Sequence, residues 1–365
     1  MILPNLALLK CGNTHGYIET SVRYFQTTRN PLRKSVKYWV CQVEQVKKIR
    51  YHITRYYLKY MKNHVNALQK IEKNFPVAIR MYRVFSEGIK IFARDIKEYV
   101  KIARLIHAPG QRDKFQSLTR REIELYHQMP KDMRHVTPIL LLSALPIVCY
   151  VIFPIAYMFP RQLLSSHFWN LQQKSEFNLI ILKSRIKHCQ PLLSTLQNEI
   201  DKTKNSKLHH EWIHILGMIG SGFRPKIEQI LSCKELFRCP PLDLHYLSGR
   251  HVKHLLKLHD LHTGLFRRTR LAERALILKE MDRAIVREGG VQNLSKDALK
   301  NACFIRGLNP INMRKEDMIK WLNNWITISS VVDKGELSLL LHCSMLLAYN
   351  EPSNWQLIYY KRKKW

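Results

Sequence analysis

Two histidine-rich stretches contain residues that could bind zinc. His210-Glu211-Trp212-Ile213-His214 has the HExxH form, in which two His one helical turn apart bind the metal and the Glu serves as a base. The second stretch consists of His251, His254, His259, His262 and Asp260. The chain has 17 His, so such clusters also arise by chance, and neither stretch has a further ligand at a recognised spacing. We predict polar helix faces and no metal site, and a metal-dependent hydrolase is the minor hypothesis.

Other enzyme motifs are missing from the sequence. It has no GxxxxGK[ST] phosphate loop, no GxGxxG after a strand, no GxSxG elbow and no EF-hand pattern. The 8 Cys include no CxxC pair, which predicts reduced thiols, several of them in the core. We therefore predict a protein that is not an enzyme and that uses no metal or other cofactor.

A run of cationic residues in the C-terminal half could bind a polyanion. Helical spacing would place Arg267, Arg270 and Arg274 on one side of a helix, where they could follow the phosphates of ribosomal RNA. The alternative is a solvated helix face whose aliphatic stems cover the core. The candidate polyanion-binding residues are Arg267, Arg268, Arg270, Arg274, Lys279, Arg283 and Arg287.

The overall charge supports an anionic partner. The 365 residues include 60 Lys and Arg against 28 Asp and Glu, a net charge of +32. Such an excess favours binding to RNA, to ribosomes or to anionic lipid headgroups, and does not choose among them.

One apolar run separates the basic segments. Residues 136–159 form 24 consecutive positions without Asp, Glu, Lys or Arg. A helix of that length would extend about 36 Å, enough to cross a hydrocarbon core about 30 Å thick. We predict one transmembrane helix, kinked by Pro138, Pro146 and Pro154. A buried helix of a soluble protein is the alternative.

The remaining sequence predicts helices. Residues 1–37 are basic, rich in Ser and Thr and contain one acid, Glu19, as in a mitochondrial presequence. Residues 38–135 predict a basic helical hairpin and then a helix that begins at a Thr119–Glu122 capping box and ends before Met129-Pro130.

Residues 160–350 predict one helical domain, and residues 351–365 a basic tail. Proline and glycine breaks delimit the helices of the domain, and Ser295 is a good N-cap. The helices that matter most below are predicted at Leu242–Leu258, Phe266–Glu288 and Lys296–Arg306.

Several stretches in a fixed order resemble a known family. Met158–Trp169 reads MFPRQLLSSHFW, Ile285–Val291 reads IVREGGV and Leu299–Leu308 reads LKNACFIRGL. Together with the proline-rich apolar run, these stretches resemble the LETM family of mitochondrial leucine-zipper/EF-hand-containing transmembrane proteins. The resemblance covers roughly residues 80–350 and is greatest to the shorter LETM-domain-containing proteins of animals, which lack the EF-hand and the coiled-coil C-terminus.

The resemblance implies a single-pass protein of the mitochondrial inner membrane with a ribosome-binding helical domain shaped like 14-3-3 proteins. It implies the mitochondrial ribosome or its rRNA and membrane lipids as partners, and roles in inner-membrane structure and protein biogenesis. A part in cation/proton exchange, which would need oligomers or partner proteins, is the alternative. The chain ends at Trp365, soon after the domain, and its apolar run carries no acid. Both departures weaken calcium sensing and exchange more than ribosome binding.

The side of the membrane on which each half lies is ambiguous. Residues 116–135 hold 4 Lys and Arg and residues 160–179 hold 2. That difference would place the N-terminal side in the matrix, whereas the family resemblance places the C-terminal domain there. We follow the resemblance. It is also the only argument for the inner over the outer membrane.

Overall fold

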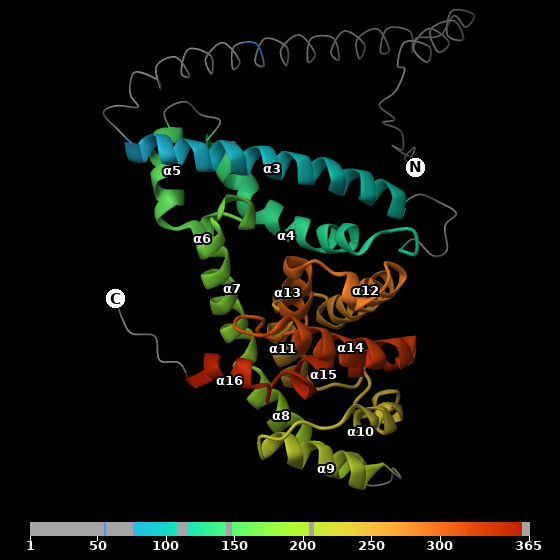
Figure 1. The fold of residues 1–365 in the computed structure, drawn as a ribbon. Helices are drawn as coiled ribbons and strands as arrows, with labels where there is room; N and C mark the ends of the chain where they lie inside the picture. Colours follow the sequence, from blue (N-terminus) through green and yellow to red (C-terminus); the bar gives the residue numbers. More distant parts are fainter. Residues whose placement is uncertain (1–54, 56–75, 108–114, 144–147, 204–207, 360–365) are drawn as a thin grey trace, which may run out of the picture. The chain divides into compact units, whose positions relative to one another are not determined.

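The computed structural model describes residue 55 and residues 76–107, 115–143, 148–203 and 208–359 (Figure 1). Contacts divide the chain into two units, Met1–Arg80 and Met81–Trp365. The predicted presequence lies outside the described residues, as does most of residues 38–75. Within the described ranges every regular element is a helix, which confirms the all-α prediction. The likeness to 14-3-3 proteins stays a prediction.

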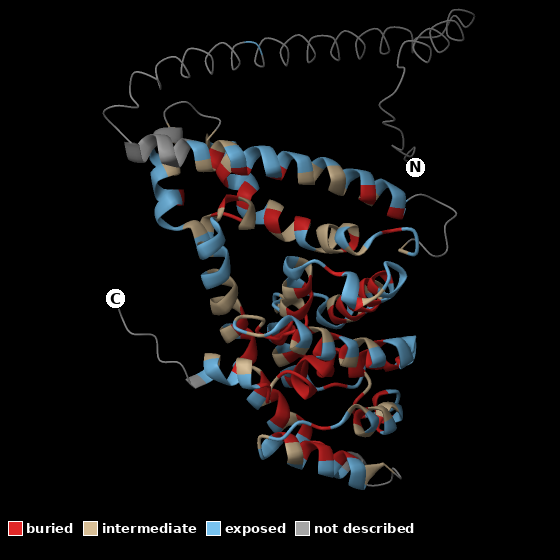
Figure 2. Cartoon of the chain, in the orientation of Figure 1, coloured by how far each residue is buried: buried red, intermediate tan, exposed pale blue. Residues whose placement is uncertain are grey.

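The core of the second unit surrounds α15 (Leu337–Leu346), in which every residue is buried. Its sequence, LSLLLHCSML, is apolar on all sides, as expected of a helix enclosed by other helices. It packs against α11 (Gly249–Leu258), α12 (Arg267–Arg287) and α14 (Lys315–Val331). Figure 2 shows the resulting concentration of buried residues. Free thiols lie in this core, as predicted, at Cys189, Cys233, Cys303 and Cys343.

Shorter helices complete the C-terminal region. They are α6 (Pro160–Leu163), η1 (Ser166–Phe168), α7 (Leu171–Ile186), α8 (Cys189–Asn198), η2 (Ile200–Thr203), α9 (His209–Gly220), α10 (Ile227–Ser232), η3 (Lys234–Phe237), η4 (Val291–Asn293), α13 (Lys296–Ile305), η5 (Lys334–Glu336) and α16 (Pro352–Tyr359). Ser295 caps α13 by accepting a hydrogen bond from the Ala298 amide at 3.3 Å, as predicted. The helix predicted from Leu242 begins only at Gly249, because Ser248 caps it there through the His251 amide.

The helix before the apolar run is longer than predicted. α4 (Arg120–Ser143) begins after the predicted capping box, in which the Glu122 carboxylate accepts from the Thr119 amide at 2.9 Å. It does not end before Pro130 but continues through that residue and through Pro138. An interior proline costs about 3 kcal/mol. Burial of Ile123, Met129 and other apolar side chains along α4 offsets that cost. A proline in the sequence signals a helix end, but it does not reveal such packing.

α4 packs along α12, so two regions that the sequence predicts to be separate share a core. One apolar cluster contains Ile102 and Ile106 of α3 (Pro76–His107), Ile123 of α4, and Met281 and Ala284 of α12. The predicted boundary between residues 38–135 and 160–350 therefore does not separate two independent parts in the structure.

The predicted proline-kinked transmembrane helix over residues 136–159 is described in two parts. α4 ends at Ser143 and α5 spans Val148–Met158, and residues 144–147 between them lie outside the described ranges. Pro138 lies inside α4 and Pro154 inside α5. Pro146 lies outside the described residues. None of the helices in the described ranges is both long and apolar enough to cross a membrane.

The predicted basic tail is partly a structured helix. Asn354, at the start of α16, is fully buried. Its side chain donates to the carbonyls of Gly307 at 2.9 Å and Ala348 at 2.6 Å, and accepts from the Asn309 amide at 2.8 Å. These bonds anchor α16 to the domain, which therefore extends to Tyr359; residues 360–365 lie outside the described ranges.

A buried ion pair joins α12, α13 and α14. The Asp282 carboxylate accepts hydrogen bonds from Arg306 at 2.5 and 3.1 Å and from the Trp325 indole at 3.0 Å. The side chains of Arg306 and Asp282 are 1% and 4% exposed. Arg306 also donates to the Ala302 carbonyl at 2.7 Å. Such a pair is stable only while both charges remain satisfied.

We predict that Asp282→Asn lowers the free energy of unfolding by about 3 kcal/mol, because it leaves the buried Arg306 guanidinium without its counter-charge. Urea unfolding of the purified chain measures the loss. Glu280→Gln on the same helix is the matched control, since Glu280 pairs with the exposed Arg283 at 2.7 Å and its loss should cost within about 1 kcal/mol. Equal effects of the two substitutions would contradict this account of the core.

Candidate polyanion-binding surface

Helix α11 presents one apolar face and one cationic face. Val252, Leu255, Leu256 and Leu258 are buried in the core. Arg250, Lys253 and Lys257 are exposed on the other side, at positions i, i+3 and i+7. Because the buried residues hold α11 in place, its three cations are carried on a rigid support.

Two histidines extend this cationic face toward the end of α7. His188 Nδ1 lies 3.2 Å from His254 Nδ1, and exposed Lys187 precedes His188. Partial burial, then His254, Lys257, Lys253 and Lys187, lower the pKa of His188. Partial burial and Lys253 lower the pKa of His254 in the same way. The neighbouring cations contribute to both shifts, and an anion would relieve the locally positive potential that they create.

The N-terminal end of α12 adjoins this face. Arg268 Nη2 donates to the Leu247 carbonyl, just before α11, at 2.8 Å. Arg267 Nε donates to Thr263 O at 2.8 Å, and Arg270 Nη2 donates to Gly264 O at 2.8 Å. These arginines thus hold the loop between the two helices, while Arg267 and Arg268 remain exposed. We call Lys187, His188, Arg250, Lys253, His254, Lys257, Arg267 and Arg268 the α11 basic surface.

Exposed aromatic side chains flank the α11 basic surface. Tyr246 is 65% exposed and lies directly before Leu247, which Arg268 contacts. Phe266 is 79% exposed and caps α12 in the left-handed conformation, with φ 55°. A left-handed non-glycine residue is uncommon. Cations beside exposed aromatic rings are the combination that binds single-stranded RNA, through phosphates and through base stacking.

The seven candidate cations of the predicted stripe do not share a surface. Arg274 is buried and donates to the Ile305 carbonyl at 3.3 Å; burial, together with Arg185 and Arg306, lowers its pKa to about 9. Lys279 is also buried and donates to the Val332 carbonyl. Both residues serve the core, because these positions of α12 face the domain interior.

The last two candidates, Arg283 and Arg287, lie toward the other end of α12, about 24 and about 30 Å from Arg267 by helical rise. Arg283 is exposed and pairs with Glu280 at 2.7 Å. Arg287 donates to the Leu118 carbonyl at 2.8 Å and so fastens the start of α4. Of the predicted set, the structure brings Arg267 and Arg268 to the α11 basic surface. Arg270 bonds the loop before α12, and the other four lie elsewhere.

The structure assigns the histidine candidates to separate partners. His251 Nε2 lies 2.6 Å from His342 Nε2 in the core, and His342 Nδ1 lies 2.6 Å from the Ser338 carbonyl. His259 Nε2 meets the Leu341 carbonyl at 2.9 Å. On α9, Glu211 of the HExxH stretch accepts a hydrogen bond from Ser232 at 2.6 Å. Among the residues that the structure describes, no three His, Cys, Asp or Glu side chains are grouped to hold a metal.

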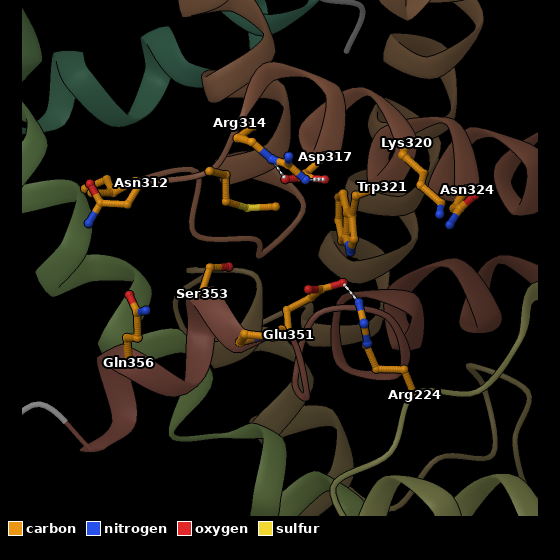
Figure 3. A pocket seen from close by; sticks show the side chains of 13 residues that line it. Arg224, Asn312, Arg314, Asp317, Lys320, Trp321, Asn324, Glu351, Ser353 and Gln356 are labelled. Atoms are coloured by element: carbon orange, nitrogen blue, oxygen red, sulfur yellow. Dashed lines mark hydrogen bonds and ion pairs between the residues drawn. The ribbon is translucent and has the colours of Figure 1, made fainter.

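A cleft of about 620 Å³ lies between α14 and the start of α16 (Figure 3). Both arginines that line it already have partners: Arg314 donates to Asp317 at 2.8 and 3.1 Å, and Arg224 pairs with Glu351. The figure shows Trp321 between these two pairs. Because the arginine charges are neutralised in place, this cleft is less suited to a polyanion than the α11 basic surface.

Arg250, Lys253 and Lys257 were not among the residues predicted from the sequence, where the histidines of this helix drew attention as metal ligands. The i, i+3, i+7 recurrence of cations was present in the sequence and could have identified this face. Their nearness to Lys187 and Arg268 could not have been read from the chain, because it depends on how α7, α11 and α12 pack.

The fold and this surface define an all-helical domain with an electropositive face, and comparison with known proteins identifies its family. The chain belongs to the LETM1-like family: the model described as "LETM1-like, RBD" matches residues 118–346. The match begins at α4, in agreement with the packing of α4 on α12.

Named relatives include LETM1 domain-containing protein 1 of Xenopus tropicalis, 31% identical over 283 residues, which are 77% of this chain and 80% of the relative. LETM1 domain-containing protein 1 of Homo sapiens is 30% identical over 281 residues, 76% of this chain and 77% of that protein. The LETM family resemblance predicted from the sequence is confirmed.

The buried histidine pair predicts acid sensitivity. Burial, with His342 and His254, lowers the pKa of His251 to about 2, and burial lowers that of His342 to about 4. In the unfolded chain both titrate near their ordinary value of about 6.5. The unfolded chain therefore takes up protons first as the pH falls. Stability should be full above pH about 6.5 and decline by several kcal/mol toward pH about 4. Each histidine contributes about 1.4 kcal/mol per pH unit between its unfolded and its folded pKa.

Thermal unfolding at pH 7.5 and pH 5 tests this prediction. The double variant His251→Gln/His342→Gln should lose less of its Tm between the two pH values than the unmodified chain. His127 and His259, whose pKa values burial also lowers, should account for the acid sensitivity that remains. The same Tm drop in both proteins would refute a role for this pair.

Proposed function

We propose that this chain is a mitochondrial membrane protein whose helical domain binds the mitochondrial ribosome through the α11 basic surface. Membership of the LETM1-like family supports the mitochondrial location and the ribosome as partner. The α11 basic surface is the single observation that carries the polyanion contact. Attachment to the inner membrane is proposed through the uncharged residues 136–159, and the adaptor would support membrane structure and protein biogenesis.

The charges of α11 are available to a partner. Within the described ranges, none of Arg250, Lys253 and Lys257 forms an ion pair with a carboxylate, whereas Arg224, Arg306 and Arg314 elsewhere in the domain do. Displacing condensed counterions from RNA phosphates would give each of these contacts a favourable, salt-dependent contribution. An unpaired, rigid cationic face is suited to that role.

The aromatic side chains favour RNA over a lipid headgroup. Anionic lipids would also be attracted to the cations. Tyr246 and Phe266 add flat, exposed rings close to the loop that Arg268 contacts, and every base has a face that can stack on such a ring. We therefore assign the surface to rRNA, and binding to anionic vesicles is the contrary outcome of the test below.

The triple variant Arg250→Gln/Lys253→Gln/Lys257→Gln should bind mitochondrial ribosomes more weakly. Its plot of log affinity against log salt concentration should be shallower by about 2–3, because each phosphate contact contributes a slope of nearly 1. Co-sedimentation of the purified full chain with ribosomes across a salt series measures both quantities.

Lys296→Gln/Lys315→Gln/Lys334→Gln is the matched control, since it removes the same charge from exposed positions on α13, α14 and η5. Its salt slope should change little. Equal slopes for the two triple variants would mean that net charge and not this surface governs binding. If the α11 triple variant lost binding to anionic vesicles but kept its binding to ribosomes, the surface would be assigned to lipid binding.

A second candidate function, a part in cation/proton exchange, rests on a titratable cluster close to the apolar run. His167 Nε2 lies 3.0 Å from Asp95 Oδ2, and His167 Nδ1 lies 3.9 Å from Asp132 Oδ2. Burial raises the pKa of Asp132, although His167 and Gln128 act in the opposite direction. A carboxyl group that can exchange protons near a membrane is the feature such transport requires.

Liposomes that contain the full chain should then show proton-coupled potassium flux, and Asp132→Asn should reduce it at least several-fold while ribosome binding persists. Glu176→Gln, at an exposed position of α7, is the control and should leave the flux unchanged. Liposomes without flux above the protein-free background would remove this candidate.

A further inference from the structure

The helices on the two sides of the apolar run 136–159 contact each other directly. The Arg120 amide donates to Glu288 Oε1 at 2.6 Å, and Asn301 Nδ2 donates to Glu124 Oε2 at 3.2 Å. Lys131 forms an ion pair with Asp260. α4, which enters the apolar run, is thus fixed to α12 and α13, which follow it by more than 100 residues.

A second set of contacts lies closer to the apolar run. Asp95 of α3 bonds His167, and the ring of Phe92 meets the ring of His167 edge-on with centroids 5.4 Å apart. A side chain at Gly88 would overlap the Phe168 ring, so the two backbones approach closely. Residues 88–95 precede the run and residues 167–168 follow it. Segments that pack in this way lie on the same side of a bilayer, because about 30 Å of hydrocarbon would otherwise separate them.

The described parts of the apolar run are two short helical arms, the end of α4 and α5, which pack together. Val136 and Ile139 of α4 share a buried cluster with Ala156 of α5. Helical rise gives residues 136–143 about 12 Å and α5 about 16 Å. Each arm is therefore as long as about half of a hydrocarbon core.

The outward sides of the two arms are apolar and exposed. The exposed fraction is 68% for Leu141, 59% for Val151 and 71% for Met158, and Leu142 and Ile155 are also exposed. Figure 2 shows exposure along much of α5, in contrast to the buried helices of the core. With no charged residue between 136 and 159, lipid tails suit this patch better than water.

We propose that residues 136–143 and 148–159 enter the bilayer from one side as the two arms of a helical hairpin and do not cross it. The inference rests on the membrane attachment of the proposed function and specifies its form. It removes the conflict over orientation, because the basic counts before and after the run then describe one side of the membrane. α3 brings exposed Lys90, Arg94, Lys97 and Lys101 to that side, where they suit anionic headgroups.

The Lys131–Asp260 ion pair supplies a direct test in native membranes. A carbodiimide joins a carboxylate to an amine in contact with it, so this pair should give an isopeptide cross-link that mass spectrometry detects. Mitochondria that contain the full chain are treated with the reagent, in parallel with the detergent-solubilised chain. The hairpin predicts equal cross-link yields in the two samples, and Lys131→Arg, which keeps the charge but does not react, should abolish the link. A link that forms in detergent but not in membranes would overturn the hairpin.

Labelling of sealed mitoplasts with a membrane-impermeant amine reagent gives an independent readout. The hairpin predicts the same result for lysines on both sides of the run, either labelling of all or protection of all. The lysines compared are Lys97 and Lys101 before the run and Lys174 and Lys315 after it. Opposite labelling of the two groups would establish a crossing.

A carbonate wash of a parallel membrane aliquot separates the two hypotheses. Release of the chain would refute membrane attachment itself and indicate that another protein or a second copy covers the apolar patch. Retention with opposite labelling would refute the hairpin alone.

Discussion

The Asp282 carboxylate lies inside the domain, where it accepts hydrogen bonds from Arg306 and Trp325. A buried charge is tolerated only when a counter-charge and hydrogen-bond donors surround it. Asp282 belongs to α12, Arg306 follows α13 and Trp325 belongs to α14, so satisfying one carboxylate determines how three helices meet. α15 then fills the apolar space beside α12 and α14, and its wholly buried sequence suits that position.

The orientation of α12 that this interaction sets also distributes the cations of that helix. Its first turn lies at the surface beside α11, its middle faces the core, and its last turn holds α4. Arg274 and Lys279 therefore bind carbonyl groups of the interior, and Arg287 binds the start of α4. The same residue types serve surface charge, core polar contacts and helix attachment, because burial and not charge decides which role each one takes.

α4 connects the two principal surfaces of the protein. Its first half packs on α12 and belongs to the region matched by the family model, and its last eight residues belong to the apolar run. A rigid helix shared by both parts would hold the α11 basic surface at a defined position relative to the membrane. This arrangement suits an adaptor that keeps a large polyanionic partner close to a bilayer, and it follows from packing that persists through Pro130 and Pro138.

The sequence by itself determined the all-α class, the family, the caps at Thr119 and Ser295 and the apolar character of residues 136–159, because these depend on local composition and short-range spacing. It also contained the cationic repeat of α11, which was overlooked. Only the tertiary structure decided that α4 continues through Pro130, that Arg274 and Lys279 are buried, and that α16 belongs to the domain. Each of these outcomes depends on contacts between residues far apart in the chain. The packing energy of such contacts exceeds local preferences of about 1–3 kcal/mol, and no local pattern encodes it.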